Sequence, residues 1–156
     1  MQDEELEYVG FWLRTGATMI DTLLILMLSV PLLLAAYGWA YFDPEQTGII
    51  AGPLDFLVSW VFPAIAVIVF WINRQATPGK MAISARVVDA TTGGRPSTAQ
   101  LVGRYFAYYV SAIPLCLGFL WVAFDAKKQG WHDKLAGTVV VRPTRRGPVP
   151  VRFGQK

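Results

Sequence analysis

The sequence predicts an all-α integral membrane protein with two full transmembrane helices and a third hydrophobic segment. Of its 156 residues, 54% are hydrophobic and only 16% are charged, and the mean hydropathy of +0.40 is too apolar for a soluble domain of this size. Three runs, residues 22–42, 56–72 and 105–124, carry no charge. Each is near the length of about 17–25 residues that a membrane-crossing helix requires.

The distribution of charge predicts the orientation of these segments. Residues 43–55 contain three acidic and no basic residues, whereas residues 73–104 contain five basic residues and residues 125–156 contain eight. The positive-inside rule then places the first loop outside the membrane, and both basic regions and both termini in the cytoplasm. The basic C-terminal region is interpreted as a topology signal or a contact with anionic membrane lipids, and no nucleic-acid partner is expected.

The first helix is expected to run from about Gly10 to about Trp39, after an acidic tail of residues 1–7. Trp12 lies where interfacial aromatic side chains meet lipid headgroups. Pro31 falls inside the helix and predicts a kink there.

The second span is expected to begin near Pro53 and to end at residue 72 or 73. Pro63 lies in its middle and leaves the carbonyl of Ser59 without its helical donor, which predicts a second kink. Asp55, at the outer end of this span, is an alternative functional carboxylate.

Two short segments rich in β-branched residues, 81–89 and 137–142, are predicted to pair as a small cytoplasmic sheet. If they pair, the hydrophobic segment between them enters and leaves from one side, as a re-entrant or broken hairpin with its bend near Pro114. The alternative is a plain third span, which would place eight basic residues outside. A single membrane domain of residues 8–142 is expected, followed by a basic, disordered tail of residues 143–156.

A charged stripe lies at the start of the first helix. Arg14 and Asp21 are seven residues apart. At about 100° per residue they share one face, with Thr18 between them and about 10 Å separating them along the axis. Charges at such a depth are costly, face protein or water, and mark function by default. The stripe is therefore the first candidate site.

These residues resemble the RDD family of small bacterial membrane proteins, which is named for an Arg and an Asp in the first span and a second Asp late in the domain. Arg14 and Asp21 match the first pair, and Asp133 matches the last. The segments 77–80 and 136–140 and residue Arg104 also resemble the family pattern. The resemblance covers about residues 8–142 and implies a membrane protein. Members are generally of unknown function, although at least one is described as a sodium/proton antiporter.

The first hypothesis is a cation/proton transporter, or a subunit of one. A partly desolvated carboxylate such as Asp21 can hold either a proton or a hard cation, and Thr18 can supply a further oxygen ligand. Arg14 would tune this site. Sodium or another monovalent cation would be the substrate, and no cofactor is expected. A chain with so little interior would need to form a homo-oligomer.

The alternative is a non-transporting structural or assembly partner of another membrane protein, in which Arg14, Asp21 and Asp133 form a buried charge clamp with Arg104. An enzyme is not expected, because His132 and Asp133 are adjacent in sequence and no Ser or Cys lies at a spacing typical of a catalytic nucleophile. Cys116 is the one cysteine in the sequence and His132 the one histidine, so no metal site is expected. Lys80 and Trp131, like Trp12, are predicted to contact lipid or its interface.

Overall fold

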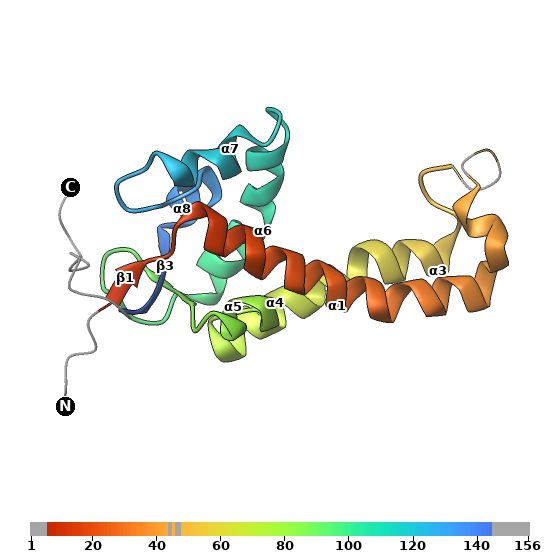
Figure 1. Ribbon diagram of the computed structural model, residues 1–156, viewed down its shortest axis with the longest axis horizontal. Coiled ribbons are helices and arrows are strands. Elements are labelled where there is room, and N and C mark those ends of the chain that lie inside the picture. The colour runs from red at the N-terminus through yellow and green to blue at the C-terminus, as the bar shows by residue number, and fades with distance from the viewer. Residues whose placement is uncertain (1–5, 44, 46–47, 145–156) are drawn as a thin grey trace.

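The computed structural model describes residues 6–43, 45 and 48–144 and is shown in Figure 1. Most of the predicted acidic N-terminal tail (residues 1–5) and of the predicted basic C-terminal tail (residues 145–156) lies outside the described residues. In chain order the elements are β1 (Leu6–Tyr8), α1 (Phe11–Tyr37), the 3₁₀ helix η1 (Gly38–Phe42), α3 (Pro53–Phe56), the π helix η2 (Leu57–Val61), α4 (Phe62–Arg74), α5 (Pro78–Ala82), β2 (Arg86–Asp89), α6 (Thr98–Ala112), α7 (Leu117–Leu120), the 3₁₀ helix η3 (Trp121–Ala123), α8 (Trp131–Ala136) and β3 (Thr138–Pro143).

Two long helical segments run side by side from the sheet to the opposite end of the molecule (Figure 1). Both are long and apolar enough to cross a membrane: the 18-residue window that qualifies Phe11–Phe42 has a mean hydropathy of 2.3, and that of Pro53–Arg74 has 2.1. Most of their large apolar side chains are exposed in the isolated chain, as is typical of surfaces that contact lipid. The chain is therefore a mostly helical protein with two membrane-type helices, as the sequence predicts.

The two prolines inside these helices have different effects on the helical backbone. Pro31 lies within α1, which is unbroken from Phe11 to Tyr37. Pro63 lies in the first turn of α4, directly after the π-helical turn η2. There the Phe62 N–H donates to the carbonyl of Leu57, five residues back. The distortion expected at Pro63 is thus a widened turn that accommodates the ring.

A three-stranded antiparallel sheet closes one end of the molecule, in the order β1-β3-β2. The predicted pairing of β2 with β3 is confirmed, with Val87 opposite Val140. The predicted first strand was too long, because residues 81 and 82 belong to α5. Pro78 opens that short helix, since its fixed backbone angle suits a first helical turn.

The third strand, β1, was not predicted, and it includes the last two residues of the expected acidic tail. It pairs along β3, with Tyr8 opposite Val141. On one face of the sheet, Val87 and Val140 pack with Trp71 of α4 and Leu101 of α6. On the other face, the alternate valines of β2 and β3 form a second buried cluster with Leu6 and Tyr8 of β1. The first face therefore shares its core with α4 and α6.

The third hydrophobic segment is bent. α6 and the segment Leu117–Ala123 meet at 110°, which rules out one straight helix. The bend lies at residues 113–116, near Pro114 as predicted, and Leu115 and Cys116 there have φ of 50° and 62°. Gly118 then packs on Ser111 so closely that a Cβ would lie 2.5 Å from the Ser111 Cα. Because β2 and β3 are paired, the segment between them leaves the sheet end and returns to it, as the hairpin interpretation expects.

Candidate functional site

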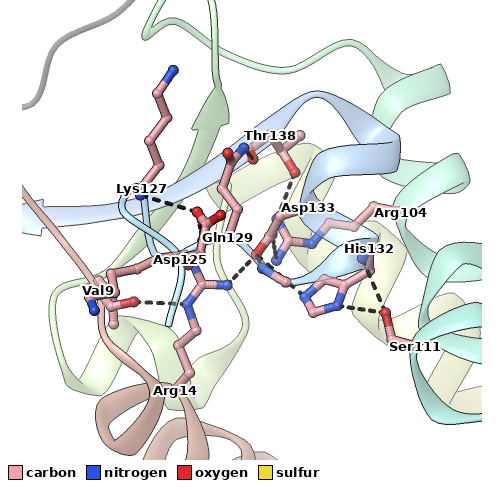
Figure 2. Close-up of polar contacts among 12 residues, drawn as sticks. Val9, Arg14, Arg104, Ser111, Asp125, Lys127, Gln129, His132, Asp133 and Thr138 are labelled. Carbon is pink, nitrogen blue, oxygen red and sulfur yellow. Dashed lines mark hydrogen bonds and ion pairs between the residues drawn. The ribbon is translucent and has the colours of Figure 1, made fainter. Parts of the chain in front are cut away.

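Asp133 is the centre of the polar network in Figure 2. It lies in the first turn of α8, and its side chain is completely buried. Its Oδ2 accepts a hydrogen bond from the Gly130 N–H at 3.0 Å, which caps the helix. A carboxylate taken fully out of water needs opposite charges nearby, and two arginines supply them.

Arg14 reaches Asp133 from α1. Its Nη1 donates to Oδ2 of Asp133 and forms an ion pair with it. Its Nη2 donates to the Lys128 carbonyl at 2.6 Å, and its Nε to the Val9 carbonyl at 3.0 Å. All three guanidinium nitrogens thus bind the protein, and they join α1 to the loop before α8 and to the residue after β1.

Arg104 approaches Asp133 from α6 and is also buried. Its Nη2 lies 2.7 Å from Oδ1 of Asp133, and its Nη1 donates to Thr138 Oγ1 at 3.1 Å. The guanidinium carbon lies 5.1 Å from the centre of the Trp71 ring, a cation–π distance. Three segments far apart in sequence, α1, α6 and α8, therefore meet at one carboxylate.

The arginines determine the charge of Asp133. Burial alone would raise the pKa of this carboxyl, but the guanidiniums of Arg104 and Arg14 outweigh burial and hold the pKa well below its usual range. Asp133 is therefore ionised throughout the physiological range.

Asp21 has different partners from those of Arg14. Its Oδ2 accepts from Thr77 Oγ1 at 2.6 Å and its Oδ1 from the Gly79 N–H at 2.7 Å. A Cβ on Gly79 would lie 1.9 Å from the Ala17 carbonyl oxygen, so only glycine allows this approach of α5 to α1. The stripe is thus split: Arg14 binds α8 and Asp21 binds α5.

Lys80, which the sequence predicts to contact lipid or its interface, is buried among protein side chains, with 7% of its surface exposed. Its Nζ lies 3.5 Å from Thr77 Oγ1 and 6.0 Å from the centre of the Trp71 ring. Burial lowers the pKa of Lys80. Trp12 is 81% exposed, and Trp131 is half-buried beside Trp121.

A cleft of about 950 Å³ lies beside the network. One wall is α1, including Thr18 and Asp21, and the others come from α4 to α8. Its lining is mostly apolar, with cationic groups from Arg14, Lys80 and Arg104. This volume and mixture are typical of ligand sites.

His132 and Ser111 belong to the network, although sequence reasoning did not connect them. Nδ1 of His132 lies 3.2 Å from Ser111 Oγ, which also accepts from the His132 backbone N–H at 3.1 Å. Nε2 lies 3.5 Å from Oδ2 of Asp133. A hydrolase triad contains the same three residue types, but there Nε2 faces the serine and Nδ1 the carboxylate. Here the two nitrogens are reversed, and Ser111 is completely buried under Gly118. The contacts lock the hairpin onto α8.

Asp55 forms a separate site at the far end of the helices. It is buried and accepts from Tyr41 Oη at 2.9 Å, Ser59 Oγ at 2.7 Å and the Ala51 N–H at 2.9 Å. These bonds join the two long helices and the end of their connecting loop.

The chain matches the family model described as RDD over residues 8–137. Its curated relatives include an uncharacterized protein of Rickettsia prowazekii, 40% identical over 48% of this chain and 41% of that protein. The uncharacterized protein YxaI of Bacillus subtilis is 31% identical over 85% of this chain and 95% of YxaI. A proline-rich antigen of Mycobacterium leprae is 30% identical over 64% of this chain and 41% of the antigen. The match thus spans less than half of two of these relatives. No solved structure matches significantly.

The burial of His132 predicts a pH-dependent stability. Burial lowers its pKa to about 3, and Arg104, Arg14 and Lys80 act in the same direction against the attraction of Asp133. The unfolded chain therefore takes up this proton near pH 6.5 and the folded chain does not, so stability falls as the pH drops below 6.5. From pH 7 to pH 5 the wild type should lose about 2 kcal/mol of unfolding free energy.

The variant His132→Gln keeps a polar side chain without a titrating ring. Its unfolding free energy, measured by denaturant titration in detergent, should change by less than half as much over the same pH interval. Equal slopes for the two proteins would show that His132 does not cause the loss. The window ends at pH 5 because unfolded carboxylates begin to titrate below it.

Proposed function

The chain belongs to the RDD family, and we propose that it is a non-transporting structural or assembly partner within a membrane complex of the bacterial inner membrane. In this role Arg14, Asp133 and Arg104 form a buried charge clamp, and Asp21 extends it by holding α5. The clamp fixes the sheet and the short helices to the ends of the long helices. Its partner would be a second copy or another membrane protein, contacted through the exposed apolar faces of α1 and α4.

The observation that carries this proposal is the complete burial of Asp133 between two arginines. A group that exchanges ions must be able to change partners, whereas Asp133 accepts hydrogen bonds from Arg14 and Gly130 at Oδ2 and forms an ion pair with Arg104 through Oδ1. Asp21 likewise has both oxygens bonded, to Thr77 and Gly79. Both carboxylates matching the family pattern therefore bind the protein itself.

The charges near the cleft also disfavour a cation. Among the described residues that line or back it, Arg14, Lys80 and Arg104 face only two carboxylates, Asp21 and Asp133. A sodium ion there would meet an excess of positive charge at low dielectric, where repulsion is strong.

A double-mutant cycle tests the clamp. Arg14→Met and Asp133→Asn should each lower the free energy of unfolding by roughly 3–5 kcal/mol, because the first removes one of the two cations that pair with buried Asp133 and the second leaves buried Arg104 without its carboxylate. The double variant should cost less than the sum of the two by at least about 1 kcal/mol, since both remove one interaction. Unfolding in mixed micelles, followed by tryptophan fluorescence, measures these values.

Arg95→Met is the matched control, because Arg95 is exposed and is not a member of the clamp. It should change stability by less than about 0.5 kcal/mol. Strictly additive losses from Arg14 and Asp133, or a wild-type melting temperature for Arg14→Met, would refute the clamp.

We also propose that the chain crosses the membrane with the sheet end in the cytoplasm. Two facts support this: the three strands belong to one sheet at one end of the long helices, and the basic residues of 73–104 flank that end.

Thiol labelling tests this orientation in a Cys116→Ala background. Thr92→Cys lies in an exposed turn after β2, and Ile49→Cys lies at the other end, where Ile49 is 90% exposed. A membrane-impermeant maleimide added to intact cells should label residue 49 and leave residue 92 unlabelled until the cells are opened. Labelling of residue 92 in intact cells would reverse the orientation.

Cation/proton exchange is a second candidate, favoured by one observation: Asp21, Thr18 and Thr22 all line the cleft. The test uses proteoliposomes that contain a pH-sensitive dye. Exchange requires that the wild type moves protons when sodium, lithium or potassium is added. This movement should be lost in Asp21→Asn and retained in the loop variant Asp43→Asn. The clamp proposal expects no such movement in the wild type at any pH tested. A cation-driven signal that depends on Asp21 would favour exchange.

A further inference from the structure

We propose that the cleft beside the clamp binds one anionic phospholipid, with the lipid phosphate next to Lys80 and an acyl chain along the apolar wall of α1. This assigns a ligand to a cleft that the clamp borders but does not fill.

The floor of the cleft carries a buried cation without a full set of partners. Lys80 is more than nine-tenths buried, yet among the described residues its Nζ has one hydrogen-bond contact, a long one of 3.5 Å to Thr77 Oγ1, besides the Trp71 ring at 6.0 Å. Within the described chain, no carboxylate forms an ion pair with it. Burying an ammonium is expensive unless an anion accompanies it. An anionic ligand would supply that charge.

Two further donors near Lys80 are also unsatisfied. The Nε1 of Trp71 and the Nε of Arg104 are buried without a hydrogen-bond partner, and both residues line the cleft. Buried polar groups are normally satisfied, so such atoms call for an explanation. Three neighbouring residues thus have unused donor capacity, which matches a ligand rich in acceptor oxygens, such as a phosphate.

The walls indicate that the ligand has an apolar part. Along α1 the lining includes Met19, Leu23 and Leu26, which are 68%, 60% and 49% exposed, and Leu120 of the hairpin lies opposite. These side chains belong to a membrane-type helix, so the cleft is continuous with a surface that contacts lipid tails. A free phosphate would leave this apolar wall unused, whereas a phospholipid covers wall and floor together.

Native mass spectrometry of the purified, delipidated full-length chain tests the proposal. Phosphatidylglycerol, phosphatidylcholine and inorganic phosphate are titrated separately. The wild type should retain phosphatidylglycerol at about tenfold lower concentration than phosphatidylcholine and should retain no inorganic phosphate. Equal affinity for the two lipids, or retention of inorganic phosphate alone, would overturn the proposal.

Lys80→Met keeps a long apolar stem and removes the charge. It should lose the tenfold preference while still binding phosphatidylcholine as the wild type does. Lys134→Met is the matched control, because Lys134 is exposed and lies outside the cleft lining. It should keep the preference, and an unchanged preference in Lys80→Met would refute the role of Lys80.

A second pair of variants tests the wall, and it keeps the test decisive if Lys80→Met does not fold. Thr18→Trp adds bulk at an exposed position that lines the cleft, whereas Leu24→Trp adds it at an exposed position of the same helix outside the lining. Thr18→Trp should weaken retention of phosphatidylglycerol about tenfold and Leu24→Trp should not. Equal retention by both variants would show that the lipid binds elsewhere.

Discussion

The burial of Asp133 is the constraint on which the rest of the structure depends. A carboxylate without solvent access costs several kcal/mol unless charged donors surround it. Here the donors come from α1 and α6, which are separated in sequence by the second long helix and by β2. Since α8 leads directly into β3, placing Asp133 also places the central strand of the sheet. Ion pairing, helix packing and strand order are therefore consequences of one requirement.

The first helix, α1, supplies one charged side chain to Asp133 and a second charged side chain to another segment. Arg14 and Asp21 lie on one face, yet Arg14 binds the loop and helix at the end of the domain, whereas Asp21 binds the start of α5. Gly79 makes the second contact possible, because any side chain there would collide with the backbone at Ala17. A single helical stripe thus holds two separate segments of the layer at the sheet end.

Much of this could be predicted from the sequence, because the relevant signals are local or additive. Uncharged runs identified the long helices, the β-branched segments identified β2 and β3, and the family resemblance, which the family match confirms, pointed to Arg14, Arg104 and Asp133. β1 escaped prediction because a three-residue strand has no pattern of its own, and its pairing is with residues 141–143. The burial of Lys80 and the Ser111–His132 contact could not be predicted either, because both depend on how α5 and the hairpin pack against the rest of the chain.

The clamp also makes the region around it positively charged. Two arginines share one carboxylate, and each guanidinium stays charged at any physiological pH. Burial lowers the pKa of Lys80, and the charges of Arg104 and Arg14 act in the same direction against the opposing effects of Tyr108 and Asp21. A third carboxylate near Lys80 would neutralise the floor of the cleft within the chain, but the described residues contain none that pairs with it. The arrangement that stabilises the fold therefore leaves a positively charged, partly apolar cleft beside a membrane-type helix. A ligand that matches both properties of this cleft is an anion with an apolar tail.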